Sequence, residues 1–463
     1  AKRWPARGAD AVAVLRGKKR FVCGVRMNGL CAVRTAPLAQ DTPPEQAEYE
    51  ICRLLFLLLC EATGRRPAWG MLTGVRPVRL VHDMRRAGKA QEEIESFFRD
   101  KYFADGEKYK LAVRTADNQA PVLALNTPRS YSLYISIPFC PSRCSYCSFV
   151  SRTVGDKSSR ALVAPYVDCL CKELAATRAA ADAAHLSIKT LYIGGGTPTS
   201  VNAQQLRQLM STMAEQFDLP ALEEFTVEAG RPDCTDEEKL RIIKEYGATR
   251  ISINPQTFSD EVLRNIGRRH TAQQTVDAFH LAREAGFTNI NMDLIVGLPG
   301  DTYETFCDTI EKVIALDPEN VTVHSLALKR SSFITQSGEI NKAHADAALA
   351  DRMMAYAEKR LTERGLEPYY LYRQSRMAGN LENTGWAKPG TECAYNIFTM
   401  DETETVLACG AGGVTKLKNP YSEDLSRIFN FKYSYEYISR YPEILERKEG
   451  IAKQYEQFRK RLH

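Results

Sequence analysis

The sequence lacks any apolar run long enough to cross a membrane. Its most apolar stretch, ICRLLFLLLC at residues 51–60, has about half the length of a spanning helix and contains Arg53. We interpret residues 45–63 as one buried helix instead. The first thirty residues also lack an apolar segment ahead of a small-residue cleavage site, so no signal peptide is expected.

A disulfide framework is missing as well, although the chain has 13 cysteines. The total is odd, and most of them are scattered without regular spacing, which indicates free thiols in a reducing compartment. We therefore expect a cytoplasmic protein. With 463 residues, 44% of them hydrophobic, the chain can form two or three domains.

The sequence has little that favours a nucleic-acid partner. The first 36 residues hold nine Lys or Arg against one acid, Asp10, but no aromatic ladder interleaves these charges. The net charge of +5 is mild. We interpret the basic segment as the solvated face of a small sheet, whose strands are AVAVLRG and KRFVCGVRM.

The first section, residues 1–128, predicts an α+β accessory domain. Beside the helix at 45–63, a second helix is expected at 90–101, and residues 71–80 form a loop-to-helix step around Pro77. Turn-forming residues at 115–130 mark a boundary.

The second section, residues 129–342, alternates short β-branched runs with segments of helical period. Strands are predicted at 131–137, 189–195, 224–229, 249–254, 289–297 and 320–327, and helices near 160–184, 202–216, 235–246, 271–285, 302–316 and 343–365. This alternation predicts an α/β fold with a parallel sheet and helices outside it. Six units are two short of a closed barrel, so a partial (β/α)6 barrel is expected. The third section, residues 343–463, predicts an α+β extension that covers the substrate.

Three cysteines, Cys140, Cys144 and Cys147, follow the first of these strands. Three thiolates can hold three irons of a [4Fe–4S] cluster and leave the fourth iron open for an outside ligand. Structural zinc would need a fourth ligand, and no further Cys or His lies nearby. A redox pair of Cys144 and Cys147 would leave Cys140 unexplained.

The C-x3-C-x2-C motif after the first strand of a partial barrel resembles the radical S-adenosylmethionine (SAM) superfamily. This resemblance implies that SAM binds the open iron and is cleaved by the reduced cluster to a 5′-deoxyadenosyl radical. The aromatic Tyr146, just before the third cysteine, also fits the family.

Further unusual stretches fall where the later strands end, and active sites of such folds lie at that edge. They are GGGTPT at 194–199, Glu228 in VEAGRPD, Gln256 in ISINPQTF and Asp293 in NMDLIVGLPG. Taken singly, a glycine triplet can be a tight turn, and an acid can be a helix cap. Together they resemble the oxygen-independent coproporphyrinogen III oxidase group, most of all its coproporphyrinogen dehydrogenase branch of the HemZ type. LTGVRP at 72–77 and GNLENTGWAKPGTECAYNI at 379–397 fit this branch.

The resemblance implies a set of residues that bind SAM and the cluster. The expected cofactor-binding residues are Tyr134, Tyr146, Phe149, Gly194, Gly195, Gly196, Thr197, Glu228, Gln256, Arg268 and Asp293, and the iron ligands are Cys140, Cys144 and Cys147. Catalytic roles are expected for Tyr134, Glu228 and Arg268, where the Arg268 guanidinium would meet a carboxylate.

The chain departs from the best-known oxidases of this group at two positions. Phe149 stands where they have a fourth cysteine, and Ser136 stands where they have a histidine. The H-N-x-x-Y-W stretch of the haem-chaperone relatives is also missing, with ENTGWAKPG as the nearest string.

The expected reaction is the oxidative decarboxylation of coproporphyrinogen III propionates to vinyl groups, which gives protoporphyrinogen IX in haem biosynthesis. The alternatives are a related radical enzyme, such as a methyltransferase or a haem-degrading enzyme, and a haem chaperone. The expected partners are a porphyrinogen or other tetrapyrrole and an electron donor such as flavodoxin or ferredoxin. The substrate has four carboxylates, so basic residues should ring its cavity, and the candidates by position are Arg264, Arg269, Lys329, Arg330 and Arg373. The alternative for each of them is an ordinary surface charge.

Overall fold

The computed structural model describes residues 10–17, 20–37, 39, 41–74, 76–327, 332, 347–374 and 377–460. The chain forms two compact units, Ala1–Gly74 with Asp83–Leu111, and Val75–His82 with Ala112–His463. The domain boundaries expected at residues 128 and 342 stay a prediction.

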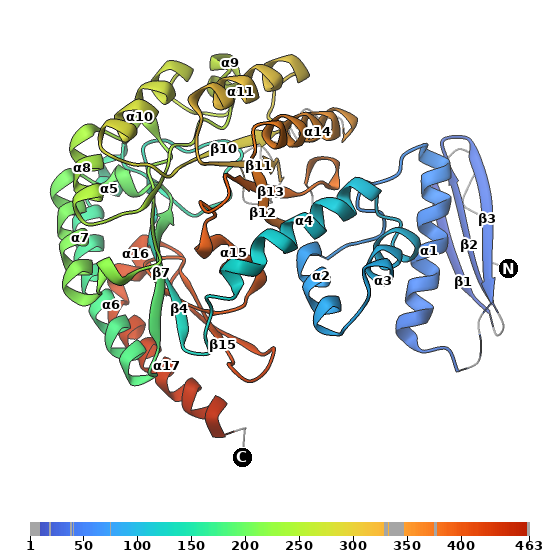
Figure 1. Ribbon diagram of the computed structural model, residues 1–463, viewed down its shortest axis with the longest axis horizontal. Coiled ribbons are helices and arrows are strands. Elements are labelled where there is room, and N and C mark those ends of the chain that lie inside the picture. The colour runs from blue at the N-terminus through green and yellow to red at the C-terminus, as the bar shows by residue number, and fades with distance from the viewer. Residues whose placement is uncertain are drawn as a thin grey trace. The chain divides into compact units, whose positions relative to one another are not determined.

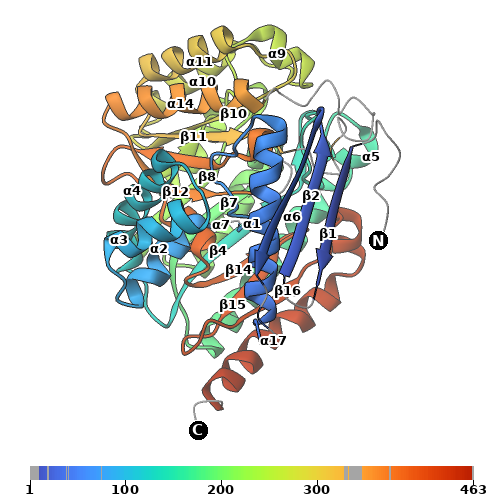
Figure 2. The ribbon, with the colours of Figure 1, turned by 90° about the vertical axis from the view of Figure 1, so that its right-hand side faces the viewer.

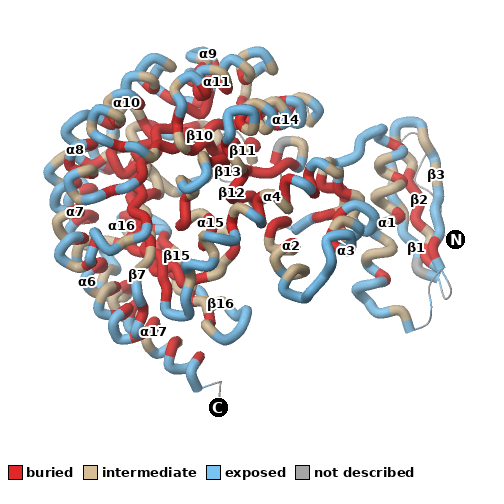
Figure 3. Tube along the Cα trace, in the orientation of Figure 1, coloured by how far each residue is buried: buried red, intermediate tan, exposed pale blue. Residues whose placement is uncertain are grey.

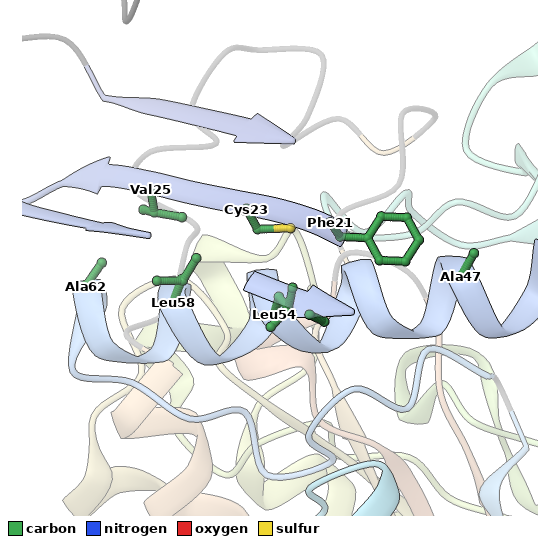
Figure 4. Packing of buried hydrophobic residues seen from close by; sticks show 8 residues of the cluster. Phe21, Cys23, Val25, Ala47, Leu54, Leu58 and Ala62 are labelled. Atoms are coloured by element: carbon green, nitrogen blue, oxygen red, sulfur yellow. The ribbon is translucent and has the colours of Figure 1, made fainter. Parts of the chain in front are cut away.

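The smaller unit contains a three-stranded antiparallel sheet of β1 (Ala11–Arg16), β2 (Arg20–Met27) and β3 (Leu30–Pro37). Helix α1 (Pro44–Thr63) covers it, and α3 (Gln91–Ser96) leads into a π-helical turn (Phe97–Lys101). Figure 4 shows side chains of β2, including Phe21 and Val25, against Leu54 and Leu58 of α1. The two expected strands are confirmed, and β3 is additional.

Helix α1 has the expected length but is not wholly buried. Only Ala47, Leu54, Leu58 and Ala62 are buried, because the helix covers a single small sheet with one face.

Helices α2 (Pro77–Arg86) and α4 (Gly106–Leu123) contain two of the three points where the chain passes from one unit to the other. Helix α2 begins at Pro77, as expected. The turn expected at 115–130 is wrong over its first half, because α4 continues to Leu123. Pro121 lies close to the end of α4, and Ala112, Ala116 and Gln119 keep a buried stripe at helical spacing up to that point.

The larger unit is built on an 11-stranded sheet, and Figure 1 shows helices arranged around it. Its central strands are β4 (Ser130–Ile137), β7 (Ser187–Gly195), β8 (Glu224–Glu228), β9 (Arg250–Ser252), β10 (Ile290–Val296) and β11 (Asn320–Ser325). These six strands pair in parallel with one another, in the order β11-β10-β9-β8-β7-β4. The expected partial barrel of six parallel strands is therefore confirmed.

The C-terminal residues extend this sheet at both edges. The added strands are β12 (Glu367–Tyr372) and β13 (Asn383–Ala387) beside β11, and β14 (Thr405–Cys409), β15 (Val414–Lys418) and β16 (Leu425–Phe429) beside β4. Strand β14 pairs in parallel with β4, so a late segment adds a seventh parallel strand. Figure 3 shows that the strands of this sheet are largely buried.

Helices cover the outside of the sheet (Figure 2). They are α5 (Lys157–Arg160), α6 (Val163–Ala183), α7 (Ala203–Gln216), α8 (Glu237–Glu245), α9 (Asp260–Asn265), α10 (Ala272–Glu284), α11 (Tyr303–Leu316), α14 (Ala347–Glu363), α16 (Ser434–Ser439) and α17 (Tyr441–Lys460). Helix α15 (Ala394–Asp401) instead packs against β7 and β12. Their N-caps fix where the chain turns back after a strand. Five helices, α7 to α11, begin at a capping residue whose side chain accepts a hydrogen bond from the backbone amide three residues later. These capping residues are Asn202, Asp236, Ser259, Thr271 and Thr302 respectively.

A buried ion pair fixes α17 to the barrel helix α6. Lys448 Nζ lies 2.9 Å from Glu173 Oε1, and both side chains are almost fully buried. Glu173 also accepts hydrogen bonds from the Gly410 amide and from Asn430 and Tyr437. The pair therefore holds the turn after β14 in place.

None of the helices among the described residues is both long and apolar enough to cross a membrane.

Candidate active site

A cavity of about 580 Å³ opens at the carboxyl ends of the parallel strands. The expected site residues that line it are Tyr134, Cys140, Cys144, Tyr146, Cys147, Phe149, Gly195, Gly196, Thr197, Glu228, Gln256, Arg268 and Asp293. Gly194 is the one member of the expected set that does not line this cavity. Residues from six different strands and their following loops thus converge on one space, as the parallel topology requires.

The loop after β4 carries the three cysteines. Cys140 lies in the short strand β5 (Phe139–Cys140), which pairs with β6 (Arg152–Thr153). The next turn is closed by a hydrogen bond from the Cys147 amide to the Cys144 carbonyl, at 3.2 Å. The segment 264–269 supports the loop, because the Ser145 amide donates to Ile266 O at 3.0 Å.

The thiols suit a cluster better than a single ion. Within the described ranges, no three His, Cys, Asp or Glu side chains are placed to hold one metal ion together. A four-iron cluster needs no such convergence, because each thiolate binds a different iron. Burial raises the pKa of Cys140, and it raises the pKa of Cys147 to about 11. Cluster binding must therefore displace protons from these thiols.

Arg231 is a member of the site that the sequence analysis did not single out. Its side chain is buried, and Nη1 lies 3.6 Å from Cys144 Sγ. The same guanidinium donates to Ser142 Oγ at 2.7 Å and forms a two-pronged ion pair with Asp233, at 3.0 and 2.9 Å. Its only signal in the sequence was its place in VEAGRPD, three residues after Glu228.

The glycine stretch after β7 passes close to the cysteine loop. A Cβ on Gly196 would lie 2.5 Å from Phe139 O and 3.0 Å from Cys140 Sγ, so only glycine fits there. Gly195 has a φ of +107°, which side chains rarely adopt. Thr197 Oγ1 donates to Cys140 Sγ at 3.6 Å. Gly194 instead makes room for two side chains, because a Cβ there would lie 2.9 Å from the Tyr192 ring and 3.1 Å from the Glu228 carboxyl.

Glu228 accepts a hydrogen bond from Tyr192 Oη at 2.6 Å. Burial raises the pKa of Glu228 to about 7, the charge of Asp293 adds to this rise, and the bond from Tyr192 opposes it. Tyr192 also stacks on Tyr134 and Tyr395, with ring centroids 6.3 and 4.4 Å away. A carboxyl group that ionises near neutral pH therefore lies beside an aromatic wall.

Arg268 is held by backbone carbonyls. Its Nη1 donates to Gly230 O and to Asn254 O, both at 3.1 Å, and Nη2 donates to Tyr146 Oη at 3.2 Å. Its buried Nε has no partner among the described residues, which leaves a donor for a bound ligand. The pairing of Arg268 with a carboxylate stays a proposal.

Gln256 lies in the loop after β9, and Asp293 lies within the adjacent strand β10. Gln256 has a φ of +66°, a strained value for a residue with a side chain, and its amide donates to Asp293 O at 2.9 Å. Asp293 Oδ1 accepts from Asn291 Nδ2 at 2.8 Å and lies 3.9 Å from His324 Nε2.

The two residues at which the chain departs from the best-known oxidases, Phe149 and Ser136, lie in different surroundings. Phe149 is 65% exposed, whereas Ser136 is buried and donates to Ala411 O.

The far wall of the cavity comes from the C-terminal region. Its side chains include Tyr370, Tyr372, Asn383, Tyr395, Asn396, Thr399 and Met400. Gly385 lets Tyr370 pack closely, because a Cβ there would lie 2.0 Å from its ring. Helix α15 is fixed by Glu224, which accepts from the Ala394 amide at 2.7 Å. Strand β12 and the stretch GNLENTGWAKPGTECAYNI thus meet in one wall.

The cations expected around this cavity do not ring it. Arg264 and Arg269 line a separate hollow, and Arg373 is buried and donates to Asn380 O. For Arg264, in the last turn of α9, and Arg269, in the loop after it, the alternative of an exposed surface charge holds instead. For Arg373 neither interpretation holds, because its side chain is buried. Lys329 and Arg330 lie outside the described residues.

Comparison with known proteins places the chain in a family. The sequence pattern of the radical SAM superfamily matches residues 134–313. The chain is 36% identical over 407 residues to the oxygen-independent coproporphyrinogen-III oxidase-like protein HemZ of Bacillus subtilis, which covers 87% of this chain and 81% of that protein. It is 34% identical over 285 residues to the heme chaperone HemW of Lactococcus lactis, covering 61% of this chain and 69% of that protein.

A solved structure shares the fold. The coproporphyrinogen III oxidase HemN of Escherichia coli, a radical SAM enzyme, matches with a TM-score of 0.53 and 24% identity over 71% of this chain and 72% of that one. The chain belongs to the radical SAM superfamily and, within it, to the oxygen-independent coproporphyrinogen III oxidase group.

Proposed function

We propose that the protein is an oxygen-independent coproporphyrinogen III oxidase of the HemZ type. It would convert two propionate side chains of coproporphyrinogen III to vinyl groups, with loss of CO2, and give protoporphyrinogen IX. The observation that carries this proposal is a single cavity with three cysteine thiols at one end and a tyrosine-rich wall at the other.

Family membership implies a [4Fe–4S] cluster and SAM, and the residues present fit both. Cys140, Cys144 and Cys147 would hold three irons and leave one for SAM. Bound together and reduced, cluster and SAM supply a carbon radical that can remove a hydrogen atom from an unactivated C–H bond.

The chain itself positions the bound ligand. The backbone at Gly196 passes close beside Cys140, where no side chain fits, and the free Nε of Arg268 offers a hydrogen-bond donor. Glu228 is placed to accept a hydrogen bond from a ligand hydroxyl or amine once it is ionised, above a pH of about 7. Because these groups are fixed by strand ends, they restrict the bound ligand to one orientation.

The aromatic wall suits a tetrapyrrole. The stacked rings of Tyr134, Tyr192 and Tyr395 present broad apolar faces, on which pyrrole rings can pack. Amide and imidazole groups of Asn383, Asn396 and His324 lie in the same cavity and can donate to propionate oxygens.

Anaerobic turnover tests the proposal. The cluster-loaded protein is incubated with coproporphyrinogen III, SAM and a reductant, and the products are quantified. We expect two 5′-deoxyadenosine and two CO2 for each protoporphyrinogen IX, and none of these from a Cys144→Ala variant. The absence of protoporphyrinogen would contradict the proposal. S-adenosylhomocysteine would indicate a methyltransferase, loss of added haem a haem-degrading enzyme, and haem binding without turnover a chaperone.

A further inference from the structure

We propose that a basic hollow beside the cysteine loop is the docking site for an acidic one-electron carrier protein. This inference rests on membership of the radical SAM superfamily and does not depend on which substrate the enzyme uses. The hollow has a volume of about 600 Å³ and is lined by Ser142, Arg143 and Thr153 together with Arg264, Gly267, Arg268 and Arg269, of which Arg268 also lines the substrate cavity. We call it the arginine hollow.

The arginine hollow is strongly cationic and open to solvent. Arg143, Arg264 and Arg269 are exposed, so their charges face outward. Neither Arg264 nor Arg269 takes part in an ion pair within the described part of the chain. Arg264 lies in the last turn of the short helix α9, and no ion pair joins it to the acids of the first turn, Asp260 and Glu261. Two exposed arginines of like charge, Arg264 and Arg269, that form no ion pair among the described residues suit a complementary acidic surface.

The hollow also lies directly behind an expected iron ligand. Gly267, between Arg264 and Arg269 in the chain, packs on the cysteine loop so closely that a Cβ there would lie 3.0 Å from Arg143 O and 3.9 Å from Cys144 Cα. Ser142 Oγ donates to Gly267 O at 3.1 Å and joins the two segments. Since electron transfer slows steeply with distance, this thin wall is a short route from the surface to Cys144.

The loop separates the arginine hollow from the substrate cavity. Its cysteines face the cavity, while Ser142 and Arg143 between them face the hollow. A carrier docked at the hollow would therefore leave the cavity free for SAM and substrate. In this step one electron leaves the reduced flavin or iron–sulfur group of the carrier and enters the cluster; the carrier is oxidised by one electron, the cluster is reduced by one, and no bond is made or broken.

Such encounters are brief and depend on charge. Redox partners bury small interfaces, and opposite charges mainly raise the rate of association. Because steering by charge changes association rates by about 10- to 1000-fold at low ionic strength, reversing two arginines should have a large effect.

The test compares a protein donor with a small one. An Arg264→Glu, Arg269→Glu variant is loaded with cluster and reduced either by the hydroquinone of a bacterial flavodoxin with an acidic face or by dithionite, and cluster bleaching is followed by stopped flow. We expect reduction by flavodoxin to slow at least about tenfold and to lose its salt dependence, with reduction by dithionite and iron content unchanged. Binding of oxidised flavodoxin, measured by calorimetry, should weaken about tenfold in parallel.

The matched control reverses two exposed cations elsewhere on the same unit, Arg459→Glu with Lys460→Glu in the last turn of α17. This control should react with flavodoxin like the unaltered protein. Equal slowing by the control would show that only net charge matters and would overturn the proposal. Unchanged binding and reduction in the hollow variant, or equal slowing with dithionite, would overturn it too. No substrate is present, so failure of the proposed decarboxylation leaves this result readable.

Discussion

The Arg231 guanidinium lies 3.6 Å from Cys144 Sγ and is held there by a two-pronged ion pair with Asp233. A buried positive charge that donates to a cluster thiolate stabilises the more negative, reduced form of that cluster. Arg231 therefore links the third strand end of the barrel to the redox properties of the cysteine loop, which begins after the first strand.

Replacing Arg231 tests this link. An Arg231→Met variant should have a lower midpoint potential, because a positive charge and a hydrogen bond next to the thiolate are lost. Its cluster should lose iron to a chelator about tenfold faster. Redox titration followed by electron paramagnetic resonance measures the potential. Arg231→Lys, which keeps the charge, should retain most of the potential; an unchanged potential in the Met variant would contradict the link.

The ionisation of Glu228 gives a pH dependence with a definite sign. Its pKa is about 7 in the folded protein against 4.5 as the ordinary value, so the folded state binds more protons between these limits. The free energy of unfolding therefore falls as the pH rises from about 4.5 through about 7. Glu228→Gln removes this loss, and at pH 8 it should be more stable than the unaltered protein by at most about 3 kcal/mol.

Urea unfolding at pH 5 and pH 8 without SAM measures the effect of Glu228→Gln. The stability gain should shrink toward pH 5, where the native carboxyl is protonated as well. Tyr192→Phe serves as the companion variant, because loss of its hydrogen bond should move the pH-dependent limb to higher pH. A gain that is independent of pH would show that Glu228 does not titrate in this range.

Two glycine substitutions should act in opposite directions. Gly196→Ala places a Cβ against Phe139 O and Cys140 Sγ, and should cost about 1–3 kcal/mol and reduce the iron content after reconstitution. Gly450 lies inside α17, with no atom closer than 3.9 Å to an added Cβ. Gly450→Ala should stabilise the protein by about 0.5–1 kcal/mol without changing iron content. Urea midpoints and iron analysis separate the two; full iron content in Gly196→Ala would contradict the close approach.

The ion pair of Lys448 and Glu173 should dominate the attachment of the C-terminal helix. Lys448→Met leaves the Glu173 charge buried without its partner and should cost about 3–5 kcal/mol. The double variant Lys448→Met, Glu173→Gln should recover part of this loss, because no unpaired charge remains. Thermal or urea unfolding measures both, and equal stability of the two variants would show that the charge pair has no such role.

The barrel strands could be predicted because each is a β-branched run bounded by turn residues, and the six strands all occur close to their expected positions. Strand β14 could not be predicted from the sequence. Its sequence, at the start of LACGAGGVTKL, looks like one arm of a glycine turn, and its partner β4 lies about 270 residues earlier in the chain. No local pattern encodes a pairing over that distance. The glycines serve the turn that follows, where a Cβ on Gly410 would lie 2.4 Å from Ser136 O.

Site residues were predictable where a motif named them. The cysteines, the glycine stretch and Glu228 come together at the cavity because their places at strand ends follow from the alternating pattern. Arg231 was missed because its partner Cys144 is 87 residues away and nothing in the spacing joins them. The choice between cavity and outer surface for Arg264 and Arg269 could not be settled in advance, because a sequence does not show toward which side a charged side chain will point.

The central claim is that the three cysteines hold a cluster with one iron open to SAM. Electron paramagnetic resonance of the reduced, anaerobically reconstituted protein tests it most directly, before and after SAM is added. We predict a [4Fe–4S] signal whose g-values shift on addition of SAM, and no such signal in a Cys147→Ala variant. Zinc in place of iron, or a cluster signal that SAM leaves unchanged, would contradict the account.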